Sequence, residues 1–293
     1  MKRRTRASVV CEAEGHLLLV RLRDPTTGVE SWFPPGGGVE EDERPAETAR
    51  RETLEETGVA VHVQSHLVLV DRYPFRWDGV DYDCVTHYFA AELEGAFDPD
   101  LAPVRDAPYH RGAKWLPSAE GLAELAVNPR IGAAVSRVLG RARRTRWRAQ
   151  GALEGPAGML LTLHDHFRVA TERLRFMFER EPDVPLGWVG RAFAPIAEML
   201  HHHHHAEEQM LFPFVERRTG SAPEKLVLDH GELTAAIDAV NDALRPETAR
   251  EDAAAALARF EDVLVDHLDR EEGLVVPVLL ELAPAEAWAL IHA

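Results

Sequence analysis

The sequence is poor in cysteine, in long apolar runs and in positive charge, and each shortage excludes a class of protein. Its 293 residues contain two cysteines, Cys11 and Cys84, too few for a disulfide framework and not paired at metal-ligand spacing. No apolar run approaches the roughly 20 residues that a membrane-spanning helix needs. The formal net charge of −16 repels a polyanion, so nucleic acid is not expected as a partner.

The first residues and the cysteines together predict a cytoplasmic protein. The opening MKRRTRASVVCEAEGHLLLV is basic, but charged and polar residues interrupt it before an apolar region of signal-peptide length develops. The two thiols are therefore expected to be reduced. One basic segment, RARRTRWRAQ (141–150), stands between two acidic halves. We interpret it as a solvated helix end or linker, with RNA or an acidic partner as the alternative.

The chain length favours two domains of about 150 residues each. Residues 1–145 mix strand patterns, such as GHLLLVRL, VHVQSHLVLV and DYDCVTHYFAAEL, with a helical pattern, RPAETARRETLEETG. Residues 157–293 instead hold four long segments of helical period, separated by EPDVPLG, RTGSAP and RPETARED. The sequence thus predicts an α/β domain, a basic and Gly/Pro-containing linker at 146–156, and an all-α antiparallel four-helix bundle.

An acidic helix is the informative feature of the first domain. Glu52, Glu55 and Glu56 are spaced i, i+3 and i+4, so their carboxylates project from one helix face. Three like charges this close repel one another unless cations lie between them, and oxygen ligands suit Mg²⁺ or Mn²⁺. The glycine loop before the helix allows the backbone to approach a metal or a phosphate. The pattern predicts metal-bridged phosphate chemistry.

Residues 36–59, GGGVEEDERPAETARRETLEETGV, resemble the Nudix box, Gx5Ex7REUxEExGU. Thr53 stands where that family usually has an aliphatic residue. The preceding WFPPGGG and the later AKWLPSAEGLAEL extend the resemblance over about residues 5–145. The remaining fixed positions of the box are occupied by Gly37, Glu43, Arg51, Glu52, Glu55, Glu56, Gly58 and Val59.

The resemblance implies an α/β/α sandwich that hydrolyses a nucleoside diphosphate linked to another moiety, by attack of water on phosphorus. It implies that Glu52, Glu55 and Glu56 bind Mg²⁺ or Mn²⁺ near the Gly37 carbonyl. By the same resemblance, Arg51 holds the glutamates and Glu43 supports the helix start. Many family members use a further glutamate outside the box, and the general base stays unassigned here. The candidates are Asp81, Asp83, Glu92 and Glu94.

The substrate is less well indicated. Pro74 lies 15 residues beyond the last position of the box, a spacing similar to that of ADP-ribose hydrolases, although a lone proline also marks a turn. Several aromatic side chains are candidates for stacking on a base, and core packing is the alternative for each. They are Trp32, Tyr73, Phe75 and Trp77.

The run HHHHHAEEQMLFPF (201–214) lies within a helical pattern. Steps of three and four residues along its apolar stripe select Phe193, Ile196, Leu200, His203, Glu207, Met210 and Phe214. The last helix repeats this arrangement with Leu257, Phe260, Leu264, His267, Glu271, Leu274 and Val278. The other two helices each place one histidine, His164 or His230, on an apolar stripe. Burying two carboxylates is costly unless they coordinate metal, and mixed imidazole and carboxylate ligands suit iron or manganese.

This half resembles the hemerythrin-like, or HHE, cation-binding domain over about residues 157–285. The resemblance implies a di-iron centre that can carry a bound oxygen species. His166 is the alternative to His164, and His204 and Glu208 are expected to flank the ligands. Thr234 stands where oxygen-carrying hemerythrins have a second histidine, which favours an oxygen, redox or iron sensor. The matched ligand positions are His164, His203, Glu207, His230, His267 and Glu271.

The two resemblances together favour a cytoplasmic hydrolase of a small nucleotide-type substrate, with a di-iron domain that senses oxygen, redox state or iron. The alternative is a non-catalytic nucleotide-binding sensor of metal or oxygen. Thr53 and the unidentified further glutamate favour that alternative, whereas the complete acidic set favours catalysis. A homodimer is compatible with both domain types.

Overall fold

The computed structural model describes residues 1–102, 104, 107–150 and 154–291. The chain divides into two compact units, Met1–Arg143 and Arg144–Ala293. The boundary falls within helix α3 (Pro129–Ala149), and helix α4 begins at Gly155. The predicted linker at 146–156 is therefore helical over residues 146–149 and from residue 155 onward, while its residues 151–153 lie outside the described residues.

The first unit is built on a mixed sheet in the order β3-β2-β1-β6-β5, with β4 paired to β1 and β7 to β2. Strands β1 and β6 run parallel, from the pair Lys2 and Tyr82 to the pair Cys11 and Ala91, and the other paired strands are antiparallel. The strands are β1 (Lys2–Ala13), β2 (His16–Arg23), β3 (Glu30–Phe33), β4 (Gly36–Gly38), β5 (Val61–Trp77), β6 (Val80–Leu93) and β7 (His110–Pro117).

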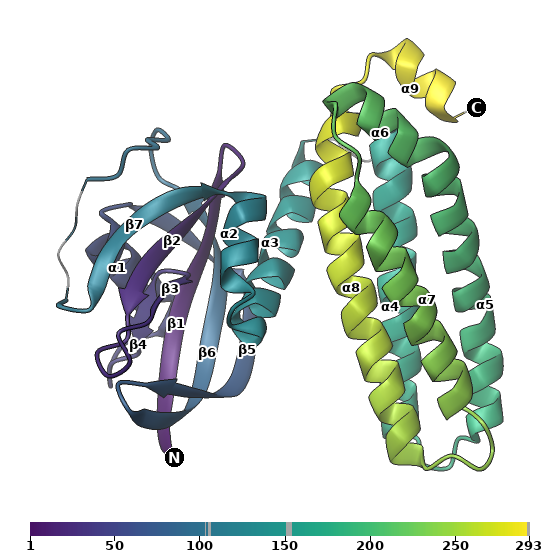
Figure 1. Ribbon diagram of the computed structural model, residues 1–293, viewed down its shortest axis with the longest axis horizontal. Helices are drawn as coiled ribbons and strands as arrows, with labels where there is room; N and C mark the ends of the chain where they lie inside the picture. Colours follow the sequence, from purple (N-terminus) through teal and green to yellow (C-terminus); the bar gives the residue numbers. More distant parts are fainter. Residues whose placement is uncertain (103, 105–106, 151–153, 292–293) are drawn as a thin grey trace. The chain divides into compact units, whose positions relative to one another are not determined.

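The alternation of side chains along the strands gives the sheet two buried faces. Val9 and Cys11 of β1 pack in the cluster that contains Ala49 of α1 (Pro45–Thr57). Val10, between them, packs in the other cluster with Val135 of α3. Helix α2 (Ser118–Leu125) also contacts β2, β3 and β7. Helices thus cover both faces (Figure 1), which confirms the predicted α/β/α sandwich.

The helix that carries the acidic motif begins and ends at strong local signals. Pro45 stands in its first turn, where a missing N–H costs nothing. Gly58 ends it with a left-handed φ of 71° and donates its N–H to the Leu54 carbonyl oxygen at 2.9 Å. Thr53 is buried on this helix and donates its hydroxyl to the Ala49 carbonyl oxygen at 2.7 Å. The threonine therefore fits an apolar position because its hydroxyl is satisfied within the helix.

The second unit is a bundle of four long helices, as predicted (Figure 1). They are α4 (Gly155–Arg180), α5 (Leu186–Ala206), α7 (Glu224–Ala243) and α8 (Arg250–Leu280). A π-helical turn, η1 (Glu207–Leu211), joins α5 to α6 (Phe212–Thr219), and α9 (Pro284–Ile291) follows α8. The core packs aromatic and branched side chains from all four long helices, including Phe167, Phe193, Leu233 and Phe260.

The π turn changes which residues face the core after Glu207. The backbone N–H of Phe212 bonds to the Glu207 carbonyl, which inserts one extra residue into the helix. Met210, predicted to be on the apolar stripe, is 44% exposed, while Phe212 and Val215 are buried. The predicted stripe on α8 is also wrong past Glu271, because Leu274 is 43% exposed and Val275 is buried. The π turn thus shifts the buried face after Glu207, whereas on α8 the step after Glu271 is four residues instead of the predicted three.

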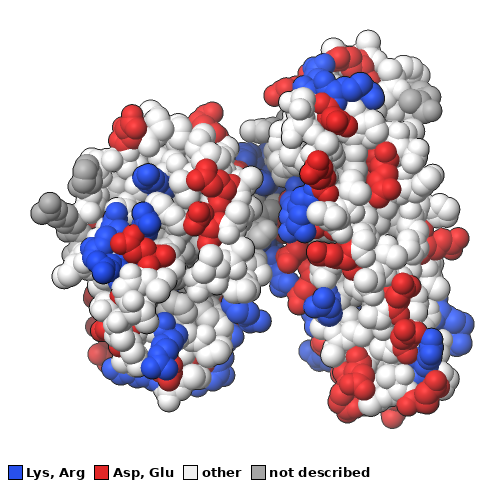
Figure 2. Space-filling view, in the orientation of Figure 1, with Lys and Arg blue, Asp and Glu red and all other residues white. Residues whose placement is uncertain are grey.

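The basic segment at 141–150, predicted to be a solvated helix end or linker, is exposed at half of its positions and buried at two. Arg143 pairs with Glu12 of β1, Arg144 is buried and pairs with Asp269, and Arg148 pairs with Asp165. Trp147 is buried in the core of the second unit. Three arginines of this segment therefore form ion pairs, and Arg141 and Arg146 are exposed. On the face in Figure 2, acidic and basic side chains are interspersed.

Within the described residues, no helix combines the length and apolarity needed to cross a bilayer.

Candidate functional sites

The glycine loop before α1 brings backbone against the acidic helix. A side chain at Gly37 would collide with Glu52, because a Cβ built there lies 2.1 Å from the Glu52 Cδ. A Cβ at Gly36 would lie 2.2 Å from the carbonyl oxygen of Ala7. Both positions require glycine for this close approach. The loop thus packs directly on the Glu52 carboxylate.

Arg51 ties three carboxylates of the motif together. Its Nε and Nη2 donate to the two oxygens of Glu43, each at 2.9 Å. Its Nη1 donates to Glu52 Oε1 at 2.9 Å and to Glu55 Oε2 at 3.0 Å. Hydrogen bonds from Arg51 and Thr48 lower the pKa of Glu43 to about 2. One guanidinium therefore keeps Glu43 ionised and holds all three carboxylates in fixed positions.

Two of the three predicted metal-binding glutamates line a pocket of about 140 Å³. Glu56 is buried, and its Oε2 accepts the backbone N–H of Gly36 at 2.8 Å. Burial raises the pKa of Glu52, and its hydrogen bond with Arg51 opposes that shift. Glu55 is half exposed and does not line this pocket. The pocket therefore presents Glu52 and Glu56 to a bound ion.

The pocket also contains cations and aromatic rings, which spacing along the chain did not reveal. Arg6 of β1 donates Nη2 to the Gly36 carbonyl oxygen at 2.9 Å, and Arg4 lies 5.6 Å from the centre of the Tyr82 ring. Burial and the nearby Arg6 lower the pKa of Arg4. No ion pair of Arg4 or Arg6 occurs among the described residues. The aromatic lining includes Phe33, Phe75, Trp77 and Tyr109.

The four candidates for the further carboxylate lie outside this pocket. Asp83 accepts hydrogen bonds from Arg72, and Glu92 accepts one from the Gln64 amide at 2.6 Å. Of the aromatic candidates, Tyr73, Phe75 and Trp77 line the pocket, and Trp32 does not. Pro74 lies in β5 opposite Asp83.

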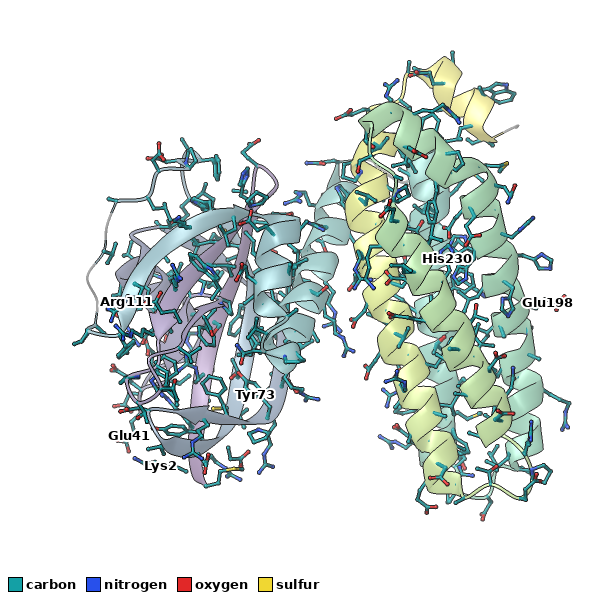
Figure 3. The ribbon with its side chains drawn as sticks, viewed as in Figure 1. Lys2, Glu41, Tyr73, Arg111, Glu198 and His230 are labelled. Carbon is teal, nitrogen blue, oxygen red and sulfur yellow. The ribbon has the colours of Figure 1, made fainter. Side chains whose placement is uncertain are left out.

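The bundle gathers imidazoles and carboxylates from all four long helices and the π turn. One group consists of His164, His203, Glu207 and Glu271, whose ligand atoms lie within 4.8 Å of one another. His204, His230 and His267 form a second group by the same criterion. Figure 3 shows His230 pointing between the helices, whereas Glu198 of α5 points away from the bundle. All seven residues of the two groups are buried.

The two carboxylates of the first group also face the second group. Glu207 Oε1 is 2.9 Å from His203 Nε2, and its Oε2 is 3.4 Å from His230 Nε2. Glu271 Oε2 is 3.3 Å from His164 Nε2 and 3.6 Å from His267 Nε2. Each carboxylate thus faces one imidazole of each group, so these side chains could hold two metal ions in the bundle core.

These buried atoms have the properties of ligands without a protein partner. The oxygens of Glu207 and Glu271 and the Nε2 atoms of His230 and His267 make no hydrogen bond of ordinary geometry with any described residue. Burial, together with Glu271, raises the pKa of Glu207. Burial also lowers the pKa of His203 to about 3, which keeps its imidazole neutral. Because unpaired buried polar atoms are costly, the donor set fits a pair of cations.

A second layer of carboxylates orients the histidines. His164 Nδ1 lies 3.0 Å from Glu272 Oε1, and His230 Nδ1 lies 2.7 Å from Glu208 Oε1. Arg168 donates to Glu272 at 2.7 Å and to Asp269 at 2.8 Å. Burial would lower the pKa of His164, but Glu271 and Glu272 outweigh it and raise that pKa to about 9. Glu208 was predicted as a flanking partner, whereas Glu272 was missed.

The structure separates the two alternatives on α4. His164 is fully buried within the first group, and His166 is exposed. Sequence spacing left both open, because the apolar stripe passes close to each. His204, predicted to flank the ligands, lies in the second group instead. A signal for it was present, since it directly follows His203, but helical period alone assigns it to the neighbouring face.

Comparison with known proteins gives a separate result for each unit. A NUDIX domain model matches residues 1–135, and a Hemerythrin HHE cation binding domain model matches residues 155–279. No curated protein matches the chain.

Three similar solved structures align with less than half of the chain. A NUDIX hydrolase from Nitrosomonas europaea is 26% identical, with 43% of this chain and 79% of that chain covered and a TM-score of 0.33. An Ap4A hydrolase from C. elegans is 22% identical, with 45% of this chain and 92% of that chain covered and a TM-score of 0.35. A MutT NUDIX hydrolase from Burkholderia pseudomallei is 24% identical, with 43% of this chain and 88% of that chain covered and a TM-score of 0.32.

Proposed function

Because the chain joins a NUDIX domain at residues 1–135 to a hemerythrin HHE cation-binding domain at residues 155–279, we propose a metal-dependent hydrolase coupled to a di-iron domain. The first domain hydrolyses a nucleoside diphosphate linked to another moiety, with Mg²⁺ or Mn²⁺. The observation that carries this proposal is the pocket in which Glu52 and Glu56 lie with two arginines and an aromatic lining.

Each part of the pocket has a task in this reaction. When bound, the divalent ions polarise the phosphorus anhydride and lower the pKa of the attacking water. Glu52 and Glu56 hold these ions, and Arg51 fixes Glu52 through a hydrogen bond of 2.9 Å. Arg4 and Arg6 offer positive charge to phosphate oxygens. Phe75 and Trp77, whose rings are stacked with an interplanar angle of 13°, offer an apolar surface to a base.

Proton transfer is assigned to the same carboxylates. Glu52 and Glu56 are the acidic side chains among the described residues that line the pocket. We therefore expect one of them to accept the proton of the attacking water, and the oxygen of that water to form the new bond to phosphorus as the anhydride P–O bond breaks. Glu55, the third glutamate of the acidic helix, is half exposed, bonded to Arg51 and outside the pocket lining.

The test is product release from nucleoside triphosphates, ADP-ribose, dinucleotide cofactors and nucleotide sugars with Mg²⁺. We expect one class to be cleaved at its anhydride, and Glu56→Gln to lower kcat by on the order of 10² to 10³-fold. Glu41→Gln, at an exposed position in the loop before α1, is the matched control. Binding of a nucleotide without cleavage would contradict the hydrolase proposal and favour the alternative, a non-catalytic nucleotide-binding sensor.

The second domain is proposed to hold two iron ions and to sense oxygen, redox state or iron. His164, His203, Glu207, His230, His267 and Glu271 are the proposed ligands. The buried oxygens of Glu207 and Glu271, which make no hydrogen bond of ordinary geometry with any described residue, support this assignment. Hydrolysis by the iron-loaded chain should then differ between reducing and oxidising conditions. Equal rates in both would leave two independent activities on one chain.

A further inference from the structure

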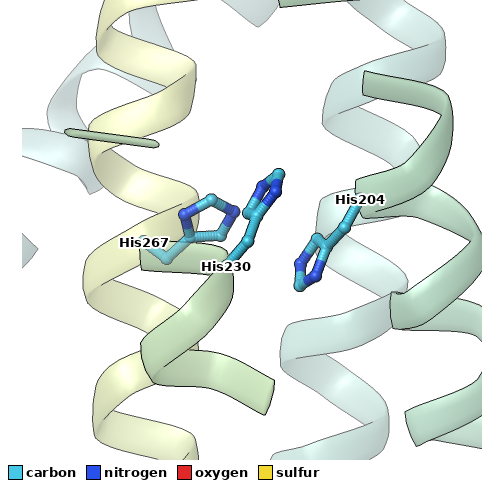
Figure 4. Close-up of side chains that lie close together, drawn as sticks. All are labelled: His204, His230 and His267. Carbon is cyan, nitrogen blue, oxygen red and sulfur yellow. The ribbon is translucent and has the colours of Figure 1, made fainter. Parts of the chain in front are cut away.

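His204 lies inside the bundle, beside two of the proposed iron ligands. It is 5% exposed, although its neighbours His202 and His205 are exposed. Its ligand atom lies within 4.8 Å of those of His230 and His267. Figure 4 shows the three imidazoles, from α5, α7 and α8, gathered in one place. Two nitrogens that bind one ion through bonds of about 2.1 Å lie at most about 4.2 Å apart, so the three imidazoles could hold one ion after small side-chain movements.

His204 is not placed to orient a metal-binding histidine through a hydrogen bond. Its ring is stacked on His230, with the ring centroids 3.9 Å apart and an interplanar angle of 10°. Imidazole donates and accepts hydrogen bonds in the plane of its ring, so parallel stacked rings do not bond to each other. His204 Nε2 is buried and makes no hydrogen bond to any residue that the structure describes. Such a nitrogen is costly unless an ion binds it.

Two consecutive histidines of α5 serve different groups because successive helical residues point about 100° apart. His203 faces α4, where its Nε2 is 3.0 Å from His164 Nε2. His204 faces the other way, towards α7 and α8, and its ring centroid is 5.5 Å from that of His267. The second group would otherwise contain only His230 and His267.

Helix α7 does not supply a second histidine at this level. Thr234, one turn after His230, is exposed, and its hydroxyl donates to the His230 carbonyl oxygen at 2.9 Å. A ligand at that position would need a different rotation of α7. The histidine missing from α7 is therefore matched by an additional one on α5.

We propose that His204 is a direct ligand of the metal ion bound by His230 and His267. This inference rests on the proposed di-iron centre. The proposal assigns two histidines, His164 and His203, to one ion and three to the other. The three are His204, His230 and His267. The two ions then differ in coordination, although Glu207 and Glu271 are available to both.

The test is an anaerobic titration of the full chain with Fe(II), with retained iron measured after desalting. The unaltered chain should retain two ions. His204→Gln should retain one, with the affinity for the second lowered more than about 100-fold, beyond the 10- to 100-fold typical of losing an outer partner. His205→Gln, the same change at the exposed neighbour, should retain two.

Each other outcome has a distinct meaning. Wild-type affinity for both ions in His204→Gln, or a loss within the range of an outer partner, would overturn the inference. An unaltered chain that retains no pair of ions would overturn the di-iron centre itself.

A second measurement uses the unaltered chain, so it does not depend on whether His204→Gln folds. In the Co(II)-loaded chain, each ligated histidine contributes one exchangeable ring N–H proton resonance that is strongly shifted by the paramagnetic ion. Five such resonances are expected if all the histidines of the two groups are ligands. Four, with the His204 resonance at its ordinary position, would show that His204 does not bind the ion.

Discussion

The carboxylates of α1 and those of the bundle stand in opposite surroundings. Arg51 bonds to Glu43, Glu52 and Glu55, whose side chains are between 16% and 49% exposed. Glu207 and Glu271 are almost fully buried, and the basic side chains that contact them among the described residues are histidines. Arg51 holds the first set in place without an ion, so it suits metal that arrives with substrate. The second set is costly when empty, so it suits a resident metal.

The sharpest test of this difference removes one buried carboxylate. Glu271→Gln keeps the side-chain shape but removes the charge between His164 and His267, so we expect nearly complete loss of retained iron. Hydrolysis by the first domain should stay measurable, because its glutamates lie in the other unit. Iron per chain after desalting is the measurement, and Glu251→Gln, exposed on the same helix, is the control. Full iron occupancy in Glu271→Gln would refute the assignment.

Removal of metal should destabilise the bundle far more than the sandwich. Binding at about 1,000 times the dissociation constant contributes about 4 kcal/mol. For a unit of this size that is a Tm shift of about 10 °C. Calorimetry before and after chelation should show the bundle transition moving down while that of the first unit stays in place. Equal shifts in both transitions would mean that the metal is not specific to the buried site.

Replacement of Arg51, which pairs with the carboxylates of the acidic motif, is expected to have an intermediate effect. Lysine cannot reproduce the paired bonds from Arg51 to both oxygens of Glu43. Arg51→Lys should therefore lower kcat/KM by about 10- to 100-fold, as expected when a residue that orients metal ligands is lost. Arg50→Lys, an exposed neighbour on the same helix, should leave the rate unchanged. A wild-type rate in Arg51→Lys would contradict a positioning role.

The smallest effect is expected at the position where the motif departs from its family. Thr53 is buried, and its hydroxyl donates to the Ala49 carbonyl oxygen within α1. Thr53→Val should change the free energy of unfolding by less than about 1.5 kcal/mol, because it removes one satisfied hydrogen bond and adds an apolar methyl group. Denaturant unfolding and kcat/KM measure this. A large loss of activity would give Thr53 a role in the reaction.

The predicted architecture agrees with the structure where local patterns were strong. The acidic helix starts at a proline and ends at a glycine, and both signals are present in the sequence. Strand β1 was not predicted, because the charged residues KRRTR hide its alternation until Ala7. The phase of α5 after Glu207 was wrong, because a π turn depends on the packing of the bundle as well as on the local sequence.

The sequence by itself determined the two domain types and the residues whose spacing places them on one helix face, from Glu52 to Glu56 and from His203 to Glu207. Helical and strand periods are local, so they can be read along the chain. Only the tertiary structure decided that Arg4 and Arg6 enter the pocket, that His164 rather than His166 faces the core, and that His204 joins His230 and His267. Those choices depend on contacts between distant segments, and no spacing within one helix encodes them.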